Sequence, residues 1–161
     1  MGMEYIKINT MVGQLTLVAS ARGLAAVLWE DEKESRVKID LGSMNPKNKH
    51  LSKTKLQLQE FFAGERSEFD LDLDPVGTEF QMNVWNKLQQ IPYGQTASYK
   101  DLAIMIGNAK ASRAIGMANG KNPLSIVVPC HRVIGASGEL TGYAGGLENK
   151  KKLLQLEQSF T

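Results

Sequence analysis

The stretch TEFQMNVWNKLQQIPYGQTASYKDLAIMIGNAKASRAIGMAN, residues 78–119, decides the fold of the second half of the chain. Apolar side chains recur in it at helical spacing, and residues that can begin or end a helix stand at the borders of the runs. Thr78 and Ser98 can cap the first two helices, and Gly107 can end the second. A third helix is predicted over 112–119. Two helices joined by a glycine-containing turn of about four residues have the dimensions of a helix-turn-helix.

The first of these helices has one apolar face, which predicts how it packs. Phe80, Val84, Trp85 and Leu88 fall near helical spacing, and the turn Pro92-Tyr93-Gly94 follows them. Because these four side chains share one side of the helix, we expect all of them to be buried.

Upstream of residue 76 the sequence predicts a small antiparallel sheet with one helix. Short runs that alternate between apolar and polar residues, or are apolar throughout, are separated by turns at hairpin spacing. The predicted strands cover 5–8, 15–18, 24–29 and 69–73. Helical spacing predicts a helix over 48–63, whereas residues 31–45 are polar and non-periodic and predict an irregular loop.

The segment Pro75-Val76-Gly77 is typical of a linker and divides the chain into two predicted domains. Residues 1–75 would form a small N-terminal α/β domain, and residues 76–161 a helical domain that contains the helix-turn-helix. The expected fold class is therefore α/β, in the α+β sense, with a winged-helix-like C-terminal half.

Charge also differs between the two halves. Residues 1–75 carry 10 basic and 12 acidic side chains, whereas residues 76–161 carry 9 basic and 5 acidic ones. This excess favours an anionic partner for the second half, although a solvated face would explain it equally well.

The composition is that of a globular protein of one or two domains. The chain has 161 residues, of which 42% are hydrophobic and 22% charged. It has no apolar stretch of the roughly 20 residues that cross a membrane, and it opens into a strand without a signal peptide. A single cysteine agrees with a reducing compartment, so we expect a cytoplasmic protein without a membrane partner.

Beyond the helix-turn-helix the sequence predicts a strand, a loop and a helix. Residues 126–128 predict a buried strand that leads to Cys130, and residues 135–146 predict a glycine-rich loop. A final helix is predicted over 147–158, with Leu153, Leu154 and Leu156 on its apolar side. The run Lys150-Lys151-Lys152 is expected on its outer side.

The only cysteine lies in the tetrad Pro129-Cys130-His131-Arg132 and is either a small core residue or a nucleophile. The imidazole and the guanidinium that follow it can both favour a thiolate. Successive side chains of an extended segment point to opposite sides, so a water or a bend would have to link Cys130 to His131. Glu157 is the best candidate to orient the imidazole, because a carboxylate among leucines needs a partner. The alternative is that Glu157 lies at a solvated helix end.

Together these residues resemble the O6-alkylguanine-DNA alkyltransferase family. The resemblance rests first on Asn122-Pro123 and, shortly after it, on Pro129-Cys130-His131-Arg132-Val133-Ile134. Glu157 falls where the family has its active-site glutamate. Further segments similar to the family are 91–99, 112–116 and 142–147. The resemblance is dense over 78–158, and a set of motifs at fixed spacing is far more specific than a Cys-His pair.

The resemblance implies four catalytic residues. Cys130 would accept the alkyl group, His131 would act as a base through a water, and Glu157 would orient His131. Asn122 would hold the turn beside the recognition helix.

For DNA and substrate binding, the resemblance implies that Tyr99 presses on a phosphate and Arg113 fills the gap that a flipped base leaves. Tyr143 and the backbone near Ala144 would line the guanine pocket. Small residues on the recognition helix suit the narrow minor groove, among them Ala111, Ser112, Ala114 and Gly116.

The implied function is DNA repair by direct reversal, with base flipping from the minor groove. The alkyl group of O6-alkylguanine, and of O4-alkylthymine, would pass irreversibly to Cys130 of a monomeric methyltransferase. The expected partner is double-stranded DNA, with no cofactor and no obligate protein partner. With one cysteine and only His50 and His131 as histidines, a four-ligand zinc site cannot form.

Two alternatives remain open at this point. An alkyltransferase-like binding module would flag lesions without transfer, but such proteins typically have Trp in place of the cysteine, and Cys130 argues against this. A cysteine hydrolase would use Cys130 and His131 but would leave Tyr99 and Arg113 without a role. Lys152 departs from the family, which often has an aromatic residue there, and this puts local packing or DNA contact in question.

Overall fold

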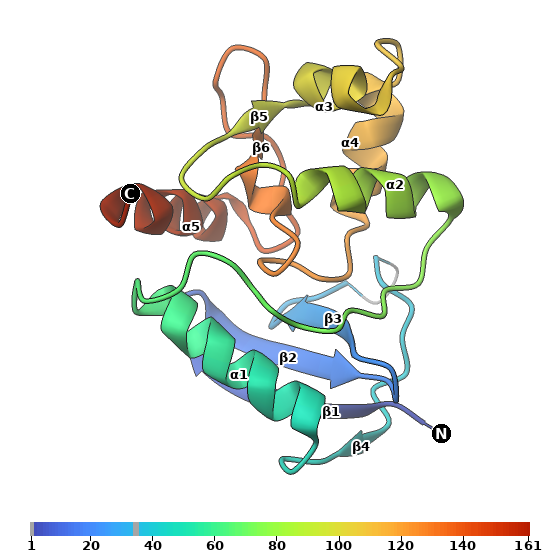
Figure 1. The fold of residues 1–161 in the computed structure, drawn as a ribbon, viewed down its shortest axis with the longest axis vertical. Coiled ribbons are helices and arrows are strands. Elements are labelled where there is room, and N and C mark those ends of the chain that lie inside the picture. The colour runs from blue at the N-terminus through green and yellow to red at the C-terminus, as the bar shows by residue number, and fades with distance from the viewer. Residues whose placement is uncertain (1, 34–35) are drawn as a thin grey trace.

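The computed structural model describes residues 2–33 and 36–161, and its first half is built on a four-stranded sheet (Figure 1). The strand order is β3-β2-β1-β4. The strands are β1 (Glu4–Thr10), β2 (Gly13–Ala19), β3 (Leu24–Trp29) and β4 (Ser43–Met44). β2 is antiparallel to both β1 and β3, and the short β4 runs parallel to β1. The first three predicted strands are therefore confirmed.

The helix predicted over 48–63 is confirmed as α1 (Lys49–Phe62), and it covers one face of this sheet. Asn48 caps it by accepting a hydrogen bond from the backbone N–H of Leu51 at 3.1 Å. Leu51, Leu58 and Phe61 are fully buried against the sheet. Burial of these side chains, more than helix propensity, stabilises this element.

Two predictions in the N-terminal half are wrong. Residues 69–73 form no strand, because only an isolated bridge joins Leu73 to Leu24. The alternating pattern instead lays an extended segment beside the start of β3, where the N–H of Leu24 donates to the carbonyl of Asp72. The segment 31–45, expected to be a loop throughout, contains β4 at its end, and residues 34–35 within it lie outside the described residues.

The helix-turn-helix stretch folds as predicted into α2 (Glu79–Leu88), α3 (Tyr99–Ile106) and α4 (Ser112–Gly120). Thr78 and Ser98 both cap their helices, and Gly107 ends α3 in the left-handed conformation with φ 85°. Glycine adopts such a positive φ without steric cost. Phe80 was expected to be buried but is 37% exposed, because it lies at the edge of the apolar face that Val84 and Trp85 occupy.

Between α4 and the final helix the chain departs from the predicted strand. Residues 126–128 make tight backbone turns, with Val128 N–H donating to the carbonyl of Leu124 at 2.8 Å. Ile126 has a φ of 74°, which a β-branched residue rarely adopts. A short 3₁₀ turn, η1 (Cys130–Arg132), and the strand β6 (Val133–Ile134) follow, and β6 pairs in parallel with β5 (Ala97–Ser98).

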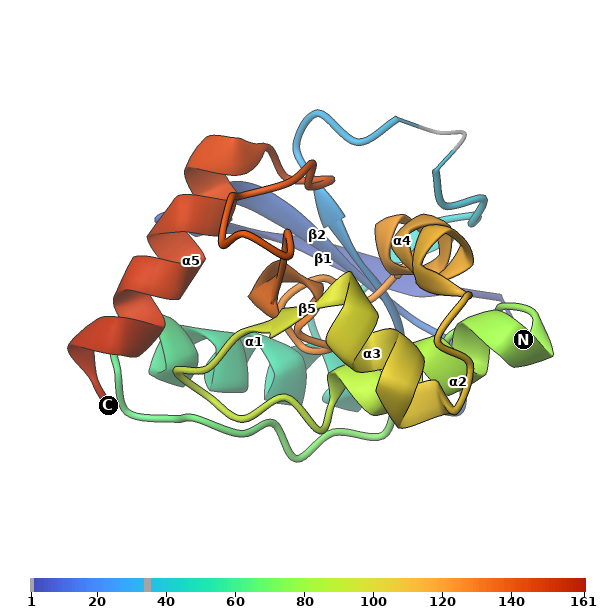
Figure 2. The same ribbon diagram turned by 90° about the horizontal axis from the view of Figure 1, so that it is seen from above.

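Helix α5 (Leu147–Ser159) closes the fold, and η1 lies between it and the helix-turn-helix (Figure 2). Lys150 was expected on the outer side of α5 but is fully buried. Leu153, one turn further along the helix, is also fully buried, and it belongs to the cluster that contains Leu15 of the sheet and Trp85 of α2. One hydrophobic core thus runs from the sheet past Cys130 to α5. The division of the chain at residue 75 stays a prediction.

The mixed α/β fold class is confirmed. Among the described residues, no helix is long and apolar enough to span a membrane.

We predict that Ser98→Ala lowers the free energy of unfolding by about 1 kcal/mol, the usual contribution of an N-cap. In the folded protein the Ser98 hydroxyl accepts from the N–H of Asp101 at 3.0 Å, and the Asp101 carboxylate accepts from the N–H of Ser98 at 2.9 Å. Urea unfolding measures the change. Ser98→Thr keeps a hydroxyl at the cap and should retain most of the stability; an equal loss in both variants would show that the cap is not the cause.

Candidate active site

The thiol of Cys130 lies in the core at the start of η1, and the residue is only 4% exposed. The 3₁₀ turn replaces the extended segment that the sequence analysis assumed. Neighbouring side chains on such a turn diverge by about 120° because it has three residues per turn. His131 therefore points away from the sulfur toward α5.

His131 is bound by Glu157 of α5. Its Nε2 lies 2.7 Å from Oε2 of Glu157, and both side chains are almost completely buried. The predicted pairing is confirmed by this geometry, and a solvated Glu157 is excluded. The helical spacing of Lys150, Leu153 and Glu157 places all three on the buried face of α5.

Arg132 completes this cluster, a role that was not expected from the sequence. Its Nε and Nη2 donate to the two carboxylate oxygens of Glu157, each at 2.9 Å, and its Nη1 donates to the carbonyl of Ile91 at 2.7 Å. A planar guanidinium can bind a carboxylate with two parallel bonds, which makes this arrangement strong and directional. The guanidinium therefore binds Glu157. The prediction that it favours a thiolate at Cys130 is wrong.

The cluster fixes the protonation of His131. Burial raises the pKa of Glu157, but hydrogen bonds from His131 and Arg132 and their charges outweigh it and lower the pKa to about 2. Burial lowers the pKa of His131, although Glu157 opposes this shift. An ionised carboxylate only accepts, so Nε2 carries the imidazole proton and Nδ1 is the basic atom. Nδ1 is buried and has no partner among the described residues.

The thiol itself is not a thiolate at rest. Burial raises the pKa of Cys130, and the side chains of Asn122, Arg36, Tyr143 and Lys150 only partly offset this. A buried thiol of this kind needs a base to remove its proton before it can attack. The imidazole of His131 is the nearest candidate base in the sequence, but its side chain is directed toward Glu157 rather than toward the sulfur.

Asn122 holds the turn before Cys130, as the resemblance implied. Its Nδ2 donates to the carbonyl of Val128 at 2.9 Å, and its Oδ1 accepts from the N–H of Leu124 at 3.0 Å. Arg36 donates in turn to the carbonyl of Asn122 at 2.8 Å. These bonds tie the turn at both ends, which accounts for the positive φ of Ile126 between them.

Lys150 binds the loop that carries Tyr143. Its Nζ donates to the carbonyls of Val133 and Thr141, at 2.6 and 3.3 Å, and lies 6.0 Å from the Tyr143 ring. Burial lowers the pKa of Lys150, whereas burial and the nearby Cys130 raise the pKa of Tyr143 well above its usual value. The Tyr143 hydroxyl has no nitrogen or oxygen partner in the described part of the chain. Tyr143 thus lies beside the thiol, while Ala144 is exposed on the loop.

The residues expected to bind DNA form a second group on the surface. Arg113 and Ala114 are exposed on α4 and Ser112 is half-buried at its start. Tyr99 begins α3, and its hydroxyl lies 2.7 Å from Oγ1 of Thr141. The Tyr99–Thr141 hydrogen bond joins the helix-turn-helix to the loop of Tyr143.

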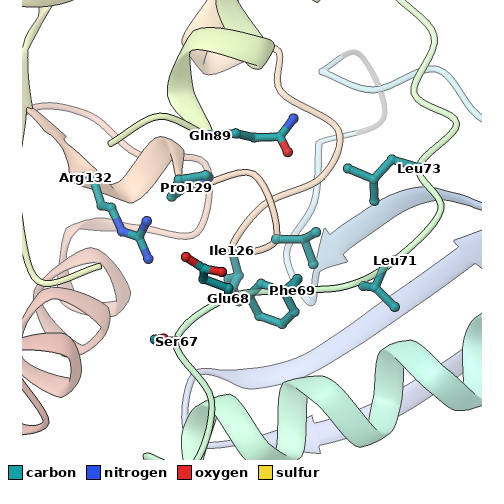
Figure 3. A pocket seen from close by; sticks show the side chains of 10 residues that line it. Ser67, Glu68, Phe69, Leu71, Leu73, Gln89, Ile126, Pro129 and Arg132 are labelled. Carbon is teal, nitrogen blue, oxygen red and sulfur yellow. The ribbon is translucent and has the colours of Figure 1, made fainter. Parts of the chain in front are cut away.

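A cavity of about 320 Å³ lies on another side of the active-site turn (Figure 3). Pro129 and Arg132 line it, together with Phe69 and Gln89. Cys130 does not line this cavity. In the described part of the chain, no group of three or more His, Cys, Asp or Glu residues could hold a metal ion.

Lys152, where the family often has an aromatic residue, lies beside the β1–β2 turn. Its Nζ donates to the carbonyl of Met11 at 3.4 Å. Its contact is thus with the sheet rather than with the helix-turn-helix.

The lowered pKa of Glu157 predicts a stability change in acid. Because the pKa falls from 4.5 to about 2 on folding, this carboxylate stabilises the fold fully above pH 4.5 and progressively less as the pH falls toward 2. Glu157→Gln should lower the free energy of unfolding at pH 7 by about 3–5 kcal/mol, since it breaks a buried pair, and should weaken the acid dependence. Thermal unfolding from pH 2 to 7 measures both. Glu148→Gln, on the exposed side of α5, is the control, and an equal acid dependence in all three proteins would contradict the prediction.

Comparison with known proteins shows which family the whole chain resembles. The DNA-binding domain of 6-O-methylguanine DNA methyltransferase matches residues 79–159, and the ribonuclease-like domain of the same protein matches residues 3–75. A methylated-DNA–protein-cysteine methyltransferase of Methanosarcina acetivorans is 47% identical over 158 residues, which cover 98% of this chain and 99% of the relative. One of Mycolicibacterium paratuberculosis is 62% identical over 102 residues, 63% of this chain and 62% of the relative.

Solved structures show the same likeness. The O6-methylguanine methyltransferase of Mycobacterium tuberculosis superposes with a TM-score of 0.87 at 45% identity, covering 99% of this chain and 94% of that one. The M. tuberculosis protein in complex with DNA superposes with a TM-score of 0.85, also at 45% identity, covering 98% of this chain and 94% of that one. Both domain models match in chain order, and a relative matches over almost its whole length. The chain therefore belongs to the 6-O-methylguanine DNA methyltransferase family.

Proposed function

We propose that this protein repairs double-stranded DNA by transferring the alkyl group of O6-alkylguanine, and of O4-alkylthymine, to Sγ of Cys130. The observation that carries the proposal is the buried imidazole of His131, held at Nε2 by Glu157 at 2.7 Å, in the residue next to the only thiol. The names of the relatives, methylated-DNA–protein-cysteine methyltransferase, support the same chemistry.

In the proposed reaction the basic Nδ1 of His131 takes the thiol proton through a water molecule. The sulfur then attacks the alkyl carbon, so that a C–S bond forms as the bond from that carbon to O6 breaks. The electron pair of the broken bond stays on the guanine, which takes up a proton at N1 from water, and His131 returns the thiol proton to water. The cysteine thiolate is a poor leaving group from an unactivated thioether, so the alkyl group stays on Cys130 and each protein molecule reacts once.

Burial of the thiol requires the target base to leave the duplex. Because Cys130 is only 4% exposed, an alkylated guanine inside the stack cannot bring its alkyl carbon to the sulfur. We infer that the base enters beside Tyr143 and the backbone near Ala144, and that Arg113 fills the space left in the stack. Ser112 and Ala114, small residues beside Arg113, suit entry of α4 into the minor groove.

The Tyr99 hydroxyl is already hydrogen-bonded within the protein, which affects how it could contact DNA. Its hydroxyl now contacts Thr141, on the loop that carries Tyr143. For Tyr99 to press on a phosphate, this hydrogen bond must break or be shared. The proposal thus links phosphate contact to the loop that lines the guanine pocket.

In this proposal a single chain supplies every catalytic group, so that neither a cofactor nor a metal nor a protein partner enters the reaction. We assign residues 1–75 to an N-terminal domain and residues 76–161 to the domain that binds DNA and accepts the alkyl group. The protein would act as a monomer in the cytoplasm.

The proposal is tested with a duplex that contains radiolabelled O6-methylguanine. We expect label on the protein up to one equivalent, with unmodified guanine left in the DNA. Binding without label would point to a module that only recognises lesions. Release of labelled product over many cycles would point to a hydrolase.

Cys130→Ser should abolish label transfer while leaving the affinity for the duplex within about twofold, because the sulfur supplies chemistry whereas surface contacts supply most DNA affinity. Transfer assays and a gel-shift titration at fixed salt measure the two properties. Transfer by the serine variant at a near-unchanged rate would exclude Cys130 as the acceptor.

Arg113→Ala should slow repair of duplex DNA by at least about tenfold more than reaction with free O6-benzylguanine, because only a flipped base leaves a stack to be filled. Rate constants on both substrates are compared. Lys110→Ala removes a positive charge just before α4 and controls for phosphate attraction. Equal losses on the two substrates would instead place Arg113 in the fold or in the pocket.

A further inference from the structure

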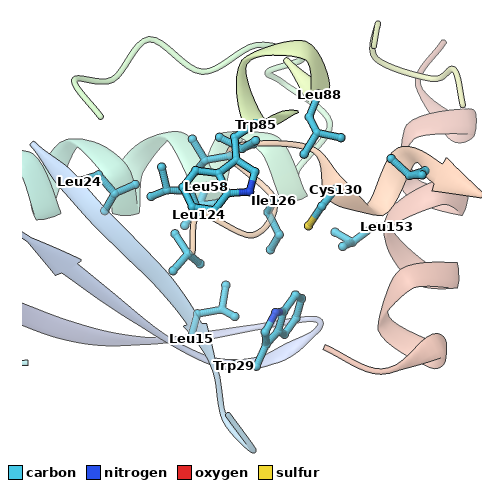
Figure 4. Packing of buried hydrophobic residues seen from close by; sticks show 14 of the residues in the cluster. Leu15, Leu24, Trp29, Leu58, Trp85, Leu88, Leu124, Ile126, Cys130 and Leu153 are labelled. Carbon is cyan, nitrogen blue, oxygen red and sulfur yellow. The ribbon is translucent and has the colours of Figure 1, made fainter. Parts of the chain in front are cut away.

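Trp29, at the end of β3, contacts two segments beside Cys130: the turn that precedes it and the loop that carries Tyr143. These two segments are the walls of the proposed alkyl pocket. It is 5% exposed and belongs to the same core cluster as Cys130 (Figure 4). The proposed reaction gives it no role. Three contacts made by its indole ring nevertheless all lead to segments around the thiol.

The first contact holds the wall that precedes Cys130. The indole N–H donates to Oγ of Ser125 at 3.0 Å, and both groups are buried. Ser125 lies in the tight turn between Asn122 and Cys130. A buried hydrogen bond of this kind fixes the position of the turn, because breaking it would leave polar groups without partners.

The other two contacts hold the opposite wall. The ring of Tyr143 meets the indole edge to face, with centroids 5.5 Å apart and an interplanar angle of 73°. The backbone of Gly145 passes so close to the indole that a Cβ there would lie 2.5 Å from Cε2 of Trp29. Thus Tyr143 cannot move toward the sheet, and the loop behind it is pressed against the same ring.

We propose that Trp29 is a positioning residue that limits the size of the alkyl group which Cys130 can accept, and so makes the protein selective for small groups such as methyl. This inference rests on the proposed function. Tyr143 lies beside the thiol, and its place is set by the indole. Because protein interiors are close-packed, space for a larger group appears only if one wall can retreat. Trp29 prevents that retreat.

The test compares transfer from O6-methylguanine and from O6-benzylguanine, each placed in the same duplex. Trp29→Leu removes the ring that supports Tyr143 and should raise the ratio of benzyl to methyl rate constants about tenfold, the lower end of the discrimination that a single methylene produces in an apolar pocket. The ratio is informative because loss of stability or of DNA affinity lowers both rate constants together.

Trp85→Phe is the matched control. Trp85 is also a buried tryptophan, 4% exposed, and its N–H donates to the carbonyl of Ala118 at 2.9 Å. This contact lies in the helix-turn-helix, away from Tyr143. The control should lose stability without any change in the benzyl-to-methyl ratio.

A second variant keeps the test decisive if Trp29→Leu does not fold. Trp29→Phe retains an aromatic ring but shortens the side chain and removes the N–H, and should shift the ratio in the same direction by a smaller factor. Gly145→Ala would press a methyl group into the indole and should slow both transfers. In a Trp29→Phe or Trp29→Leu protein, Gly145→Ala should slow the transfers less, because the side chain that its methyl group contacts is smaller.

The inference is overturned if a folded Trp29→Leu or Trp29→Phe protein has the same benzyl-to-methyl ratio as the unchanged protein and Trp85→Phe. That outcome would leave the proposed function standing. Equal effects of Gly145→Ala in both backgrounds would also overturn the inference. Failure of the unchanged protein to take label from O6-methylguanine would overturn the proposed function itself.

Discussion

The carboxylate of Glu157 is the constraint on which the active-site turn depends. It accepts from Nε2 of His131 and from two nitrogens of Arg132, all within 2.9 Å, in a part of the core that is almost closed to solvent. Buried ion pairs rarely add much to net stability, but removal of one partner leaves the other charge buried without compensation. The carboxylate therefore fixes two consecutive side chains of η1, and through them the direction of the thiol between Pro129 and His131.

A second set of bonds fixes the chain before the thiol. Asn122 binds both ends of the tight turn with its amide, and Arg36 reaches from the N-terminal half to the carbonyl of Asn122. The unfavourable φ of Ile126 persists because the surroundings determine it from both sides. Pre-organisation of this kind places a reactive atom without a cost at the moment of reaction, and in the proposed reaction it would offset the raised pKa of the buried Cys130 thiol.

Residue pattern alone predicted the helix-turn-helix, its caps and the three main strands, because local spacing and capping chemistry determine them. It also predicted the pairing of His131 with Glu157, since a carboxylate among leucines needs a partner. It failed where contacts between distant segments decide. Arg132 binds Glu157 rather than supporting the thiol. Lys150 can be buried because the carbonyls of Val133 and Thr141 accept hydrogen bonds from its Nζ. The 3₁₀ turn at Cys130 likewise depends on Asn122, six residues before Val128.

The contact between β3 and the segment after α4 constrains how such a protein can evolve. The N–H of Val27 donates to the carbonyl of Pro123 at 2.8 Å, so the edge of the sheet is completed by the chain that leads to the thiol. Exchange of either half for an unrelated module would expose that edge and free the reactive turn. Recombination that replaces either half must therefore preserve this contact between β3 and the segment after α4.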